Sequence, residues 1–330
     1  MKRSTAVLLA AGRGTRMKTS VSKQYLELQG MPVFLHSLRA LTRSSVITDI
    51  VVTVSDGDQD YVWDLIRGYD LDEKVRLVTA GGAERFHSVY NGLRAVDWPC
   101  DYAFIHDSAR AFVDQDTLIR LYETVERTGS AVAGVPSKDT VRITDGTGRM
   151  IETPNRNTVW IVQTPQVFRF HDILRAHELL LAHLDEVAAK GITITDDAMV
   201  ADTMLGIKSQ MVMASYTNIK LTTPDDLELA ELILRDIREA HRKDTTTADD
   251  GSVPTGNDVK DLLVKTMSAP VEEVIADMLI KQMAIPREEI TEEELHAFIS
   301  LISKAKRKAS VANMRGKVIP HGHGNGKRKR

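Results

Sequence analysis

The sequence predicts an α/β fold in which a mostly parallel sheet is covered by helices on both faces. Short runs of β-branched and apolar residues alternate with segments of helical length up to about residue 242, and this alternation is typical of parallel strands joined by crossover helices. The runs are apolar at nearly every position, as expected for strands buried on both sides. The 330 residues are 42% hydrophobic and 27% charged, a balance that excludes a disordered acidic chain.

Five apolar runs have the length and β-branched content of buried strands: residues 6–9, 50–54, 75–78, 102–105 and 131–135. The segments between them have helical length: residues 32–42, 58–68, 87–96 and 115–127. A helix between successive strands brings the chain back to the edge where the previous strand began, so that neighbouring strands can run in the same direction.

A turn-rich insertion interrupts this alternation. Residues 140–144 and 150–153 flank Asp145-Gly146-Thr147-Gly148, a strong turn signal, so a β-hairpin is predicted there. A hairpin inserted into a parallel domain is expected to project as an arm, here over about 138–156.

The elements after the arm complete the domain. They are a long helix over about 171–189 ended by Gly191, a short helix near 197–204, and strands near 210–214 and 217–221. Thr223 and Pro224 then open a helix to about residue 242, with Thr223 as N-cap and Pro224 at the first helical position.

Charge is distributed unevenly along the chain. The formal net charge is −3, yet residues 304–330 contain ten Lys and Arg and no Asp or Glu. After a domain over residues 1–242, we predict a linker over 243–258, a small helical module over 259–304 and a basic, disordered tail over 305–330. The basic tail is either a solvated segment without a partner, or it binds an acidic partner, nucleic acid or the acidic remainder of this chain.

The single cysteine, Cys100, excludes a disulfide framework and fits a reducing cytoplasm. No apolar run approaches the roughly 20 residues that span a bilayer. The apolar run after Met1-Lys2-Arg3 is too short for a signal peptide, and Arg13 follows it closely. We therefore predict a cytoplasmic protein without a membrane partner.

A loop rich in small residues follows the first predicted strand, from Leu8 to Met17. Small residues let backbone N–H groups approach an anion closely, and Arg16 and Lys23 add positive charge. The glycine pattern alone is a weak signal, because a tight turn would also explain it.

Further motifs follow this loop in a specific order: LAAGRGTRM, SKQYL, GGAERFHSV, HDSARAF, SKDTVRI, NRN, QTPQVF, TDDA and NIKLTTPDDL. With these motifs the chain resembles the 2-C-methyl-D-erythritol 4-phosphate cytidylyltransferase family over about residues 4–240. The resemblance implies a Rossmann-like nucleotide-binding domain and a homodimer interlocked through the hairpin arm. It also implies a reaction of CTP with 2-C-methyl-D-erythritol 4-phosphate that uses Mg²⁺ and releases pyrophosphate.

The resemblance also implies roles for individual residues. The catalytic positions are Arg16 and Lys23, which stabilise the transition state, and Arg156 and Lys220, which hold the sugar phosphate. The positions implied for CTP are Ala10, Ala11, Gly12, Lys23, Gly82, Ser88, Asp107 and Ser108. The positions implied for the acceptor substrate are Asp107, Arg110, Thr140, Arg156, Thr164, Thr195 and Lys220, with Thr140 and Arg156 reaching across the dimer. Asp107 is also the implied ligand of Mg²⁺ or another divalent cation.

The reaction itself explains why cations dominate this set. The nucleophile is a phosphate monoester whose second pKa is about 6, so it is mostly a dianion at neutral pH and needs no general base. Negative charge grows on the α-phosphoryl oxygens, and cations and N–H dipoles stabilise it. We therefore expect His106 to have a structural role.

Three residues depart from the family pattern, and they leave the choice of acceptor substrate open: Ser22, Ala83 and Ala111. The alternative substrate is D-ribitol 5-phosphate, which HDSAR and KLTTPDDL favour. LAAG and TDDAMV favour methylerythritol phosphate. For residues 259–330 the alternative to a catalytic role is an interaction or nucleic-acid-binding module.

Overall fold

The computed structural model describes residues 2–12 and 23–246. Residues 1–241 form one compact unit, and the helical module and basic tail lie outside the described residues and stay predictions. Among the described residues, no helix is long and apolar enough to cross a membrane.

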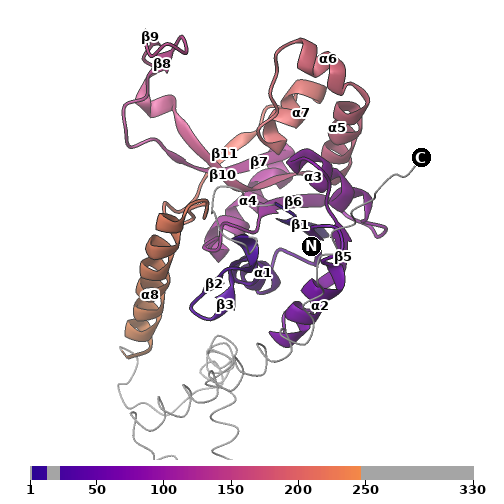
Figure 1. Cartoon of the computed structure of the whole chain (residues 1–330), viewed down its shortest axis with the longest axis vertical. Coiled ribbons are helices and arrows are strands. Elements are labelled where there is room, and N and C mark those ends of the chain that lie inside the picture. The colour runs from indigo at the N-terminus through magenta and orange to yellow at the C-terminus, as the bar shows by residue number, and fades with distance from the viewer. Residues whose placement is uncertain (1, 13–22, 247–330) are drawn as a thin grey trace, which may run out of the picture. The chain divides into compact units, whose positions relative to one another are not determined.

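Seven strands of the described residues form the central sheet, in the order β11-β7-β10-β6-β1-β4-β5 (Figure 1). Their bounds are β1 Ser4–Ala10, β4 Asp49–Val54, β5 Val75–Ala80, β6 Tyr102–Asp107, β7 Ser130–Pro136, β10 Trp160–Arg169 and β11 Gln210–Met213. Strand β10 runs antiparallel to β6 and β7, whereas the other paired strands are parallel. The prediction of a mostly parallel sheet is confirmed.

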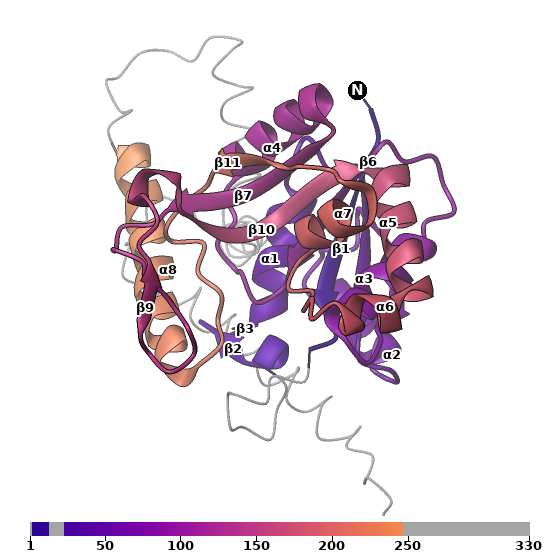
Figure 2. The ribbon, with the colours of Figure 1, turned by 90° about the horizontal axis from the view of Figure 1, so that it is seen from above.

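Helices cover both faces of this sheet. The helices of the described residues are α1 Val33–Thr42, α2 Gln59–Gly68, α3 Arg85–Arg94, α4 Gln115–Thr128, α5 Phe170–Ala182, α6 Leu184–Ala189, α7 Asp197–Leu205 and α8 Pro224–Thr246. Seen from above, α3, α5 and α7 lie on one side of the sheet, and α1 and α4 lie on the other (Figure 2). Strands β4 and β6 are buried at every position because helices exclude water from both of their faces.

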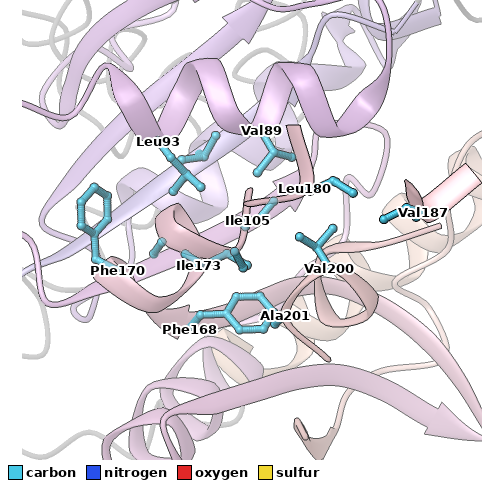
Figure 3. Close-up of a cluster of buried hydrophobic side chains, with 13 residues drawn as sticks. Val89, Leu93, Ile105, Phe168, Phe170, Ile173, Leu180, Val187, Val200 and Ala201 are labelled. Atoms are coloured by element: carbon cyan, nitrogen blue, oxygen red, sulfur yellow. The ribbon is translucent and has the colours of Figure 1, made fainter. Parts of the chain in front are cut away.

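A cluster of buried apolar side chains lies on the α3, α5 and α7 side of the sheet. Val89 of α3, Ile173 of α5 and Val200 of α7 meet there above Ile105 and Phe168 of the sheet (Figure 3). All five side chains are at most 1% exposed, and full burial of such a side chain stabilises the fold by roughly 1.5–3 kcal/mol. This cluster fixes α3 and α7 against β6, and all three elements lead into the candidate site.

The predicted hairpin is present and projects as an arm beyond the ends of β7 and β10 (Figure 1). Its strands, β8 Ile143–Thr144 and β9 Met150–Glu152, are shorter than predicted. Gly146 and Gly148 adopt positive φ angles of 84° and 93° in the turn, a conformation that glycine adopts without strain.

Two predictions for the segments after the arm were wrong, and one strand was missed. The segment over 171–189 is two helices, α5 and α6, which are separated at His183. Residues 217–221 form no strand, because side chains from other segments bind their backbone and the Asn218 amide. Strand β10 was not predicted, because the polar residues Gln163, Thr164 and Gln166 interrupt its apolar pattern, and its pairing with β7 has a register shift between Val162 and Gln166.

The remaining short elements lie before α1. A 3-10 helix, η2 (Lys23–Tyr25), leads into the two-residue strands β2 (Glu27–Leu28) and β3 (Met31–Pro32), which pair with each other. Leu28 packs with Leu234 of α8 in a second cluster of buried apolar side chains, which holds the start of α8 against this part of the chain.

Candidate active site

The predicted nucleotide-binding residues follow the carboxyl ends of neighbouring strands. Leu9 of β1 pairs with Asp107 of β6, and Ala10 of β1 pairs with Val54 of β4. The N–H of Ser108 donates to the Leu9 carbonyl at 3.1 Å, which holds the two strand ends together. Ligands of α/β proteins bind outside the carboxyl ends of the strands, so this edge is the expected site.

A close approach joins the loop after β1 to the loop after β5. A Cβ on Gly81 would overlap with the Cβ of Ala11 and would lie 2.7 Å from Ser88 Oγ. The N–H of the next residue, Gly82, donates to Ser88 Oγ at 3.0 Å. The structure therefore brings together Ala11, Gly82 and Ser88, three of the residues implied for CTP, and Ala10 and Gly12 flank Ala11 in the chain.

Asp107 lies at the centre of the charged part of the site. Its Oδ2 accepts from Lys220 Nζ at 2.7 Å, and its Oδ1 accepts from Arg85 Nε at 3.2 Å. Burial alone would raise the pKa of the Asp107 carboxyl, but the cations Arg85 and Lys220 outweigh burial and hold that pKa well below its usual range. Asp107 is thus a carboxylate at neutral pH.

Thr164 and His106 form a chain of hydrogen bonds that ends at the backbone N–H of Asp107. Thr164 Oγ1 accepts from the Asp107 backbone N–H at 3.0 Å and lies 3.0 Å from His106 Nδ1. The other ring nitrogen of His106 lies 3.2 Å from the Arg110 carbonyl oxygen. Burial lowers the pKa of His106 to about 4, so the ring is neutral and both its nitrogens are engaged within the protein. His106 therefore orders the loop after β6, and Thr164 is turned toward the protein.

Arg110 connects the loop after β6 to the segment that carries Lys220. Its Nη1 donates to the Asn218 carbonyl at 2.8 Å, and Asn218 in turn donates from Nδ2 to Gln163 Oε1 at 2.9 Å. The guanidinium group of Arg110 is therefore occupied by backbone oxygen in this structure. Its predicted contact with substrate stays a prediction.

Arg85 and Asp197 were missed by the sequence analysis. Arg85 is the first residue of α3 and donates from Nη2 to Asp197 Oδ2 at 2.7 Å, in addition to its bond to Asp107. Asp197 begins α7 and is fully buried, with His177 Nε2 lying 3.3 Å from its Oδ1. Both residues lie inside quoted motifs, but nothing in those motifs shows that they meet.

The neighbours of Asp197 bring the TDDA motif to the same region. Asp196 is the N-cap of α7 and accepts from the Met199 N–H at 2.9 Å, and it also accepts from Gln166 Nε2 at 2.9 Å. Thr195 precedes this cap and is exposed. Its side chain is thus accessible to an acceptor substrate.

Two predicted residues belong to the arm. Arg156 begins the 3-10 helix η3 (Arg156–Thr158) and lies 3.5 Å from the Lys138 carbonyl oxygen, within the arm itself. Thr140 is exposed on the arm. Within the part of the chain that the structure describes, neither side chain has a hydrogen bond or ion pair with Asp107, Lys220 or Arg85.

Arg16 lies outside the described residues, as does the side chain of Lys23, so their roles stay predictions. The same holds for Ser22. Ala83 is exposed, whereas Ala111 is buried beside Phe112 and Leu221, which explains a small apolar residue at that position.

The described carboxylates of the site do not by themselves form a complete metal-binding site. Among the described residues, no three His, Cys, Asp or Glu side chains are placed to hold a metal ion together. Asp107 is a lone carboxylate whose oxygens already accept from cations. Such a donor set fits Mg²⁺ only where substrate phosphates supply most of its ligands, as is common for this ion.

Fold and site together define a nucleotide-binding α/β enzyme, with buried carboxylates and cations gathered at the carboxyl edge of its sheet. The family is given by comparison with known proteins. The model of the 2-C-methyl-D-erythritol 4-phosphate cytidylyltransferase family matches residues 4–236. The chain belongs to this family, whose members are cytidylyltransferases, so the resemblance seen in the sequence is confirmed.

Individual relatives agree with this assignment. The 2-C-methyl-D-erythritol 4-phosphate cytidylyltransferase of Lachnoclostridium phytofermentans is 41% identical over 237 residues, which is 72% of this chain and 98% of the relative. The enzyme of that name from Desulforamulus reducens is 40% identical over 230 residues, with 70% of this chain and 95% of the relative covered.

Solved structures show the same fold. A 4-diphosphocytidyl-2C-methyl-D-erythritol synthase from Anaerococcus prevotii superposes with a TM-score of 0.61 at 29% identity and covers 71% of this chain and 96% of its own. The 2-C-methyl-D-erythritol 4-phosphate cytidylyltransferase of Francisella tularensis gives a TM-score of 0.56 at 30% identity, with 70% and 99% covered.

Proposed function

We propose that this protein transfers the cytidylyl group of CTP to 2-C-methyl-D-erythritol 4-phosphate. The products are 4-diphosphocytidyl-2-C-methyl-D-erythritol and pyrophosphate, in the synthesis of isoprenoid precursors. The observation that carries the proposal is the family match over residues 4–236, joined with relatives of the same name that the chain covers almost completely.

The reaction needs positive charge to stabilise its transition state, and it needs no general base. An oxygen of the acceptor phosphate attacks the α-phosphorus of CTP, and the bond from that phosphorus to the pyrophosphate oxygen breaks. The acceptor phosphate is already mostly a dianion at neutral pH. The neutral, fully engaged His106 agrees with a reaction that takes no proton from its nucleophile.

Lys220 is the described cation best placed for the acceptor. Its ammonium group is anchored on Asp107 at 2.7 Å, while its side chain remains 35% exposed. A partly exposed, anchored ammonium group can bind a phosphate dianion in a fixed position, which favours attack geometry. We assign the triphosphate of CTP to Arg16 and Lys23, and the acceptor also to Arg110 and Thr195. Thr164 would act on the acceptor through its hydrogen bond to the Asp107 backbone.

Magnesium belongs to the same proposal. Asp107 would hold the ion together with phosphate oxygens of CTP, and bound Mg²⁺ would neutralise the triphosphate. Ser108, which follows Asp107, and Ser88 with Gly82 would then bind the nucleoside part.

A homodimer completes the site in this proposal. Thr140 and Arg156 lie on the arm, and exposed apolar side chains occur there at Ile143, Met150 and Ile151. These side chains would be buried if the arm packed against a second copy, and the partner's arm would bring Thr140 and Arg156 to the acceptor phosphate.

The assay of this function is pyrophosphate release from CTP with each of two acceptors. We expect rapid release with 2-C-methyl-D-erythritol 4-phosphate and slow release with D-ribitol 5-phosphate. Ser108 and the LTTPDD segment, which begins at Leu221, favour the second acceptor, so a preference for ribitol phosphate would overturn the proposal. Omission of Mg²⁺ is expected to abolish release with either acceptor.

Residues beyond 242 remain a separate proposal. The basic tail is assigned to an acidic partner or nucleic acid, and a cytoplasmic location stays a prediction. A chain ended after Arg242 is expected to keep its kinetics and to lose salt-sensitive association with polyanions. Altered catalysis in that chain would instead favour a contact with the enzyme domain.

A further inference from the structure

Arg85 binds two carboxylates that lie far apart in the sequence. Its Nε donates to Asp107 at 3.2 Å, and its Nη2 donates to Asp197 at 2.7 Å. Asp197 is fully buried and Arg85 is 29% exposed at its side chain, so this bridge is largely shielded from water.

The bridge is ionic in all three of its members. Burial would lower the pKa of Arg85, but Asp197 and Asp107 outweigh burial and raise that pKa. Burial would raise the pKa of Asp197, but Arg85 and the nearby His177 outweigh burial and lower that pKa. A buried charge that loses its partner is strongly unfavourable, so each carboxylate holds the guanidinium in place and the guanidinium holds each carboxylate.

Arg85 also stands where three parts of the site meet. It begins α3, whose first turn carries Ser88 on the nucleotide side. Asp107 ends β6 and anchors Lys220 on the acceptor side. Asp197 begins α7, directly after Thr195 and Asp196.

We propose that Arg85 is a positioning residue, which aims the Asp107–Lys220 pair and ties the start of α7 to the nucleotide-binding side. The catalytic consequence of this inference rests on the proposed function. Arg85 occupies one oxygen of Asp107 and leaves the other for Lys220, so the carboxylate cannot rotate away from the ammonium group. A lysine at this position keeps the charge but lacks the planar fork that reaches both carboxylates.

The test compares Arg85→Lys with Arg94→Lys, the same substitution at the exposed end of the same helix. We expect Arg85→Lys to lower kcat at saturating substrates at least 10-fold and to change KM for CTP less than threefold. Arg94→Lys is expected to leave both constants unchanged. Asp197→Asn is expected to lower kcat as well, and the double variant to be no slower than the slower single variant, because both changes break one bridge.

Hydrogen exchange provides a readout that needs no turnover. In Arg85→Lys the amides of residues 85–88, 106–110 and 195–200 are expected to exchange faster together, with β4 unchanged. A kcat within threefold of wild type, or unchanged exchange at 106–110 and 195–200, would overturn the inference while leaving the proposed function intact. If the wild-type protein transfers cytidylyl to neither sugar phosphate, the proposed function fails, and faster joint exchange still supports the bridge.

Discussion

Lys220 acts on the reaction through a single ammonium group whose place is set by Asp107. Substitution by alanine removes a charge that stabilises the acceptor and the growing negative charge in the transition state. We expect Lys220→Ala to lower kcat/KM for the sugar phosphate roughly 100-fold, equivalent to about 2.7 kcal/mol. Pyrophosphate release measures this loss.

Lys208→Ala is the matched control for Lys220→Ala. Lys208 pairs with Asp202 at 2.6 Å, and its side chain is 81% exposed. Exposed ion pairs contribute little, so Lys208→Ala is expected to keep wild-type activity. Equal losses in both variants would contradict the role of Lys220.

His36 makes the stability of the folded chain depend on pH. Burial, aided by the charge of Arg39, lowers the pKa of His36 to about 4 from 6.5. The unfolded chain therefore takes up the proton first as the pH falls, so the stabilisation is complete above about pH 6.5 and is lost between 6.5 and about 4. The contribution is about 3 kcal/mol.

Urea unfolding at a series of pH values tests this prediction. His36→Gln retains an N–H donor for the Leu28 carbonyl, which lies 3.0 Å from His36 Nε2, and removes the titrating group. Its free energy of unfolding should fall less between pH 6.5 and 4 than that of wild type. His171→Gln, at an exposed position, should follow the wild-type curve, and a His36→Gln curve parallel to wild type would refute the assignment.

At the residue scale, the family motifs singled out Asp107, Lys220, Gly82 and Ser88. The structure pairs Lys220 with Asp107 and Gly82 with Ser88, while their roles toward substrate stay predictions. Arg85 was not found. Its partners lie 22 and 112 residues away in the sequence, and a basic residue in the first turn of a helix has no pattern that predicts a bridge. Pairs of this kind arise from tertiary packing, which one sequence does not reveal.

At the scale of elements, α3 lies unusually close to the sheet at Gly92. A Cβ there would lie 2.5 Å from Val7 Cγ1 and 2.9 Å from Thr53 Cγ2, both on buried strands. Gly92→Ala should therefore destabilise the fold by about 1–3 kcal/mol through overpacking, although alanine is the better helix former. Thermal or urea unfolding measures the difference.

Gly68→Ala is the control for this prediction. Gly68 ends α2, and a Cβ there would meet nothing within 4 Å. Helix propensity then acts alone, and the variant should be neutral or more stable by up to about 1 kcal/mol. A Gly92→Ala protein as stable as Gly68→Ala would show that α3 can move away from the sheet.

Strands and helices with regular patterns were predicted within a few residues. The strands β1, β4, β6 and β7 are mostly apolar and are buried at nearly every position, which explains why their pattern is clear. Strand β10 escaped prediction because Gln163, Thr164 and Gln166 are polar and buried in side-chain hydrogen bonds. The same bonds explain the irregular backbone around Asn218, where a strand was expected.

At the scale of the whole molecule, the proposed dimer predicts that activity can be shared between subunits. If Arg156 acts across the interface, Lys220→Ala and Arg156→Ala damage different halves of each composite site. A mixed dimer then contains one site with both defects and one with neither. Random exchange of equal amounts should restore about a quarter of wild-type activity, although each variant alone is nearly inactive.

Pyrophosphate release after mixing and subunit exchange measures this recovery. A mixture of Lys220→Ala with Asp107→Asn is the control, because both residues belong to the same half and every mixed dimer has two damaged sites. Equal activity in the two mixtures would exclude a role of Arg156 across the interface. Light scattering during exchange establishes that the dimer persists.

The arm leaves the sheet after Pro136 and returns to it at Trp160, and these two residues are paired with each other in neighbouring strands. Both ends of the arm therefore start from the same pair of opposed residues in β7 and β10. Insertions, deletions or replacement of the segment between these two residues therefore need not change how the other residues of β7 and β10 are paired. The arm can thus diverge in length and sequence between relatives, while the sheet edge that holds Asp107 keeps its register.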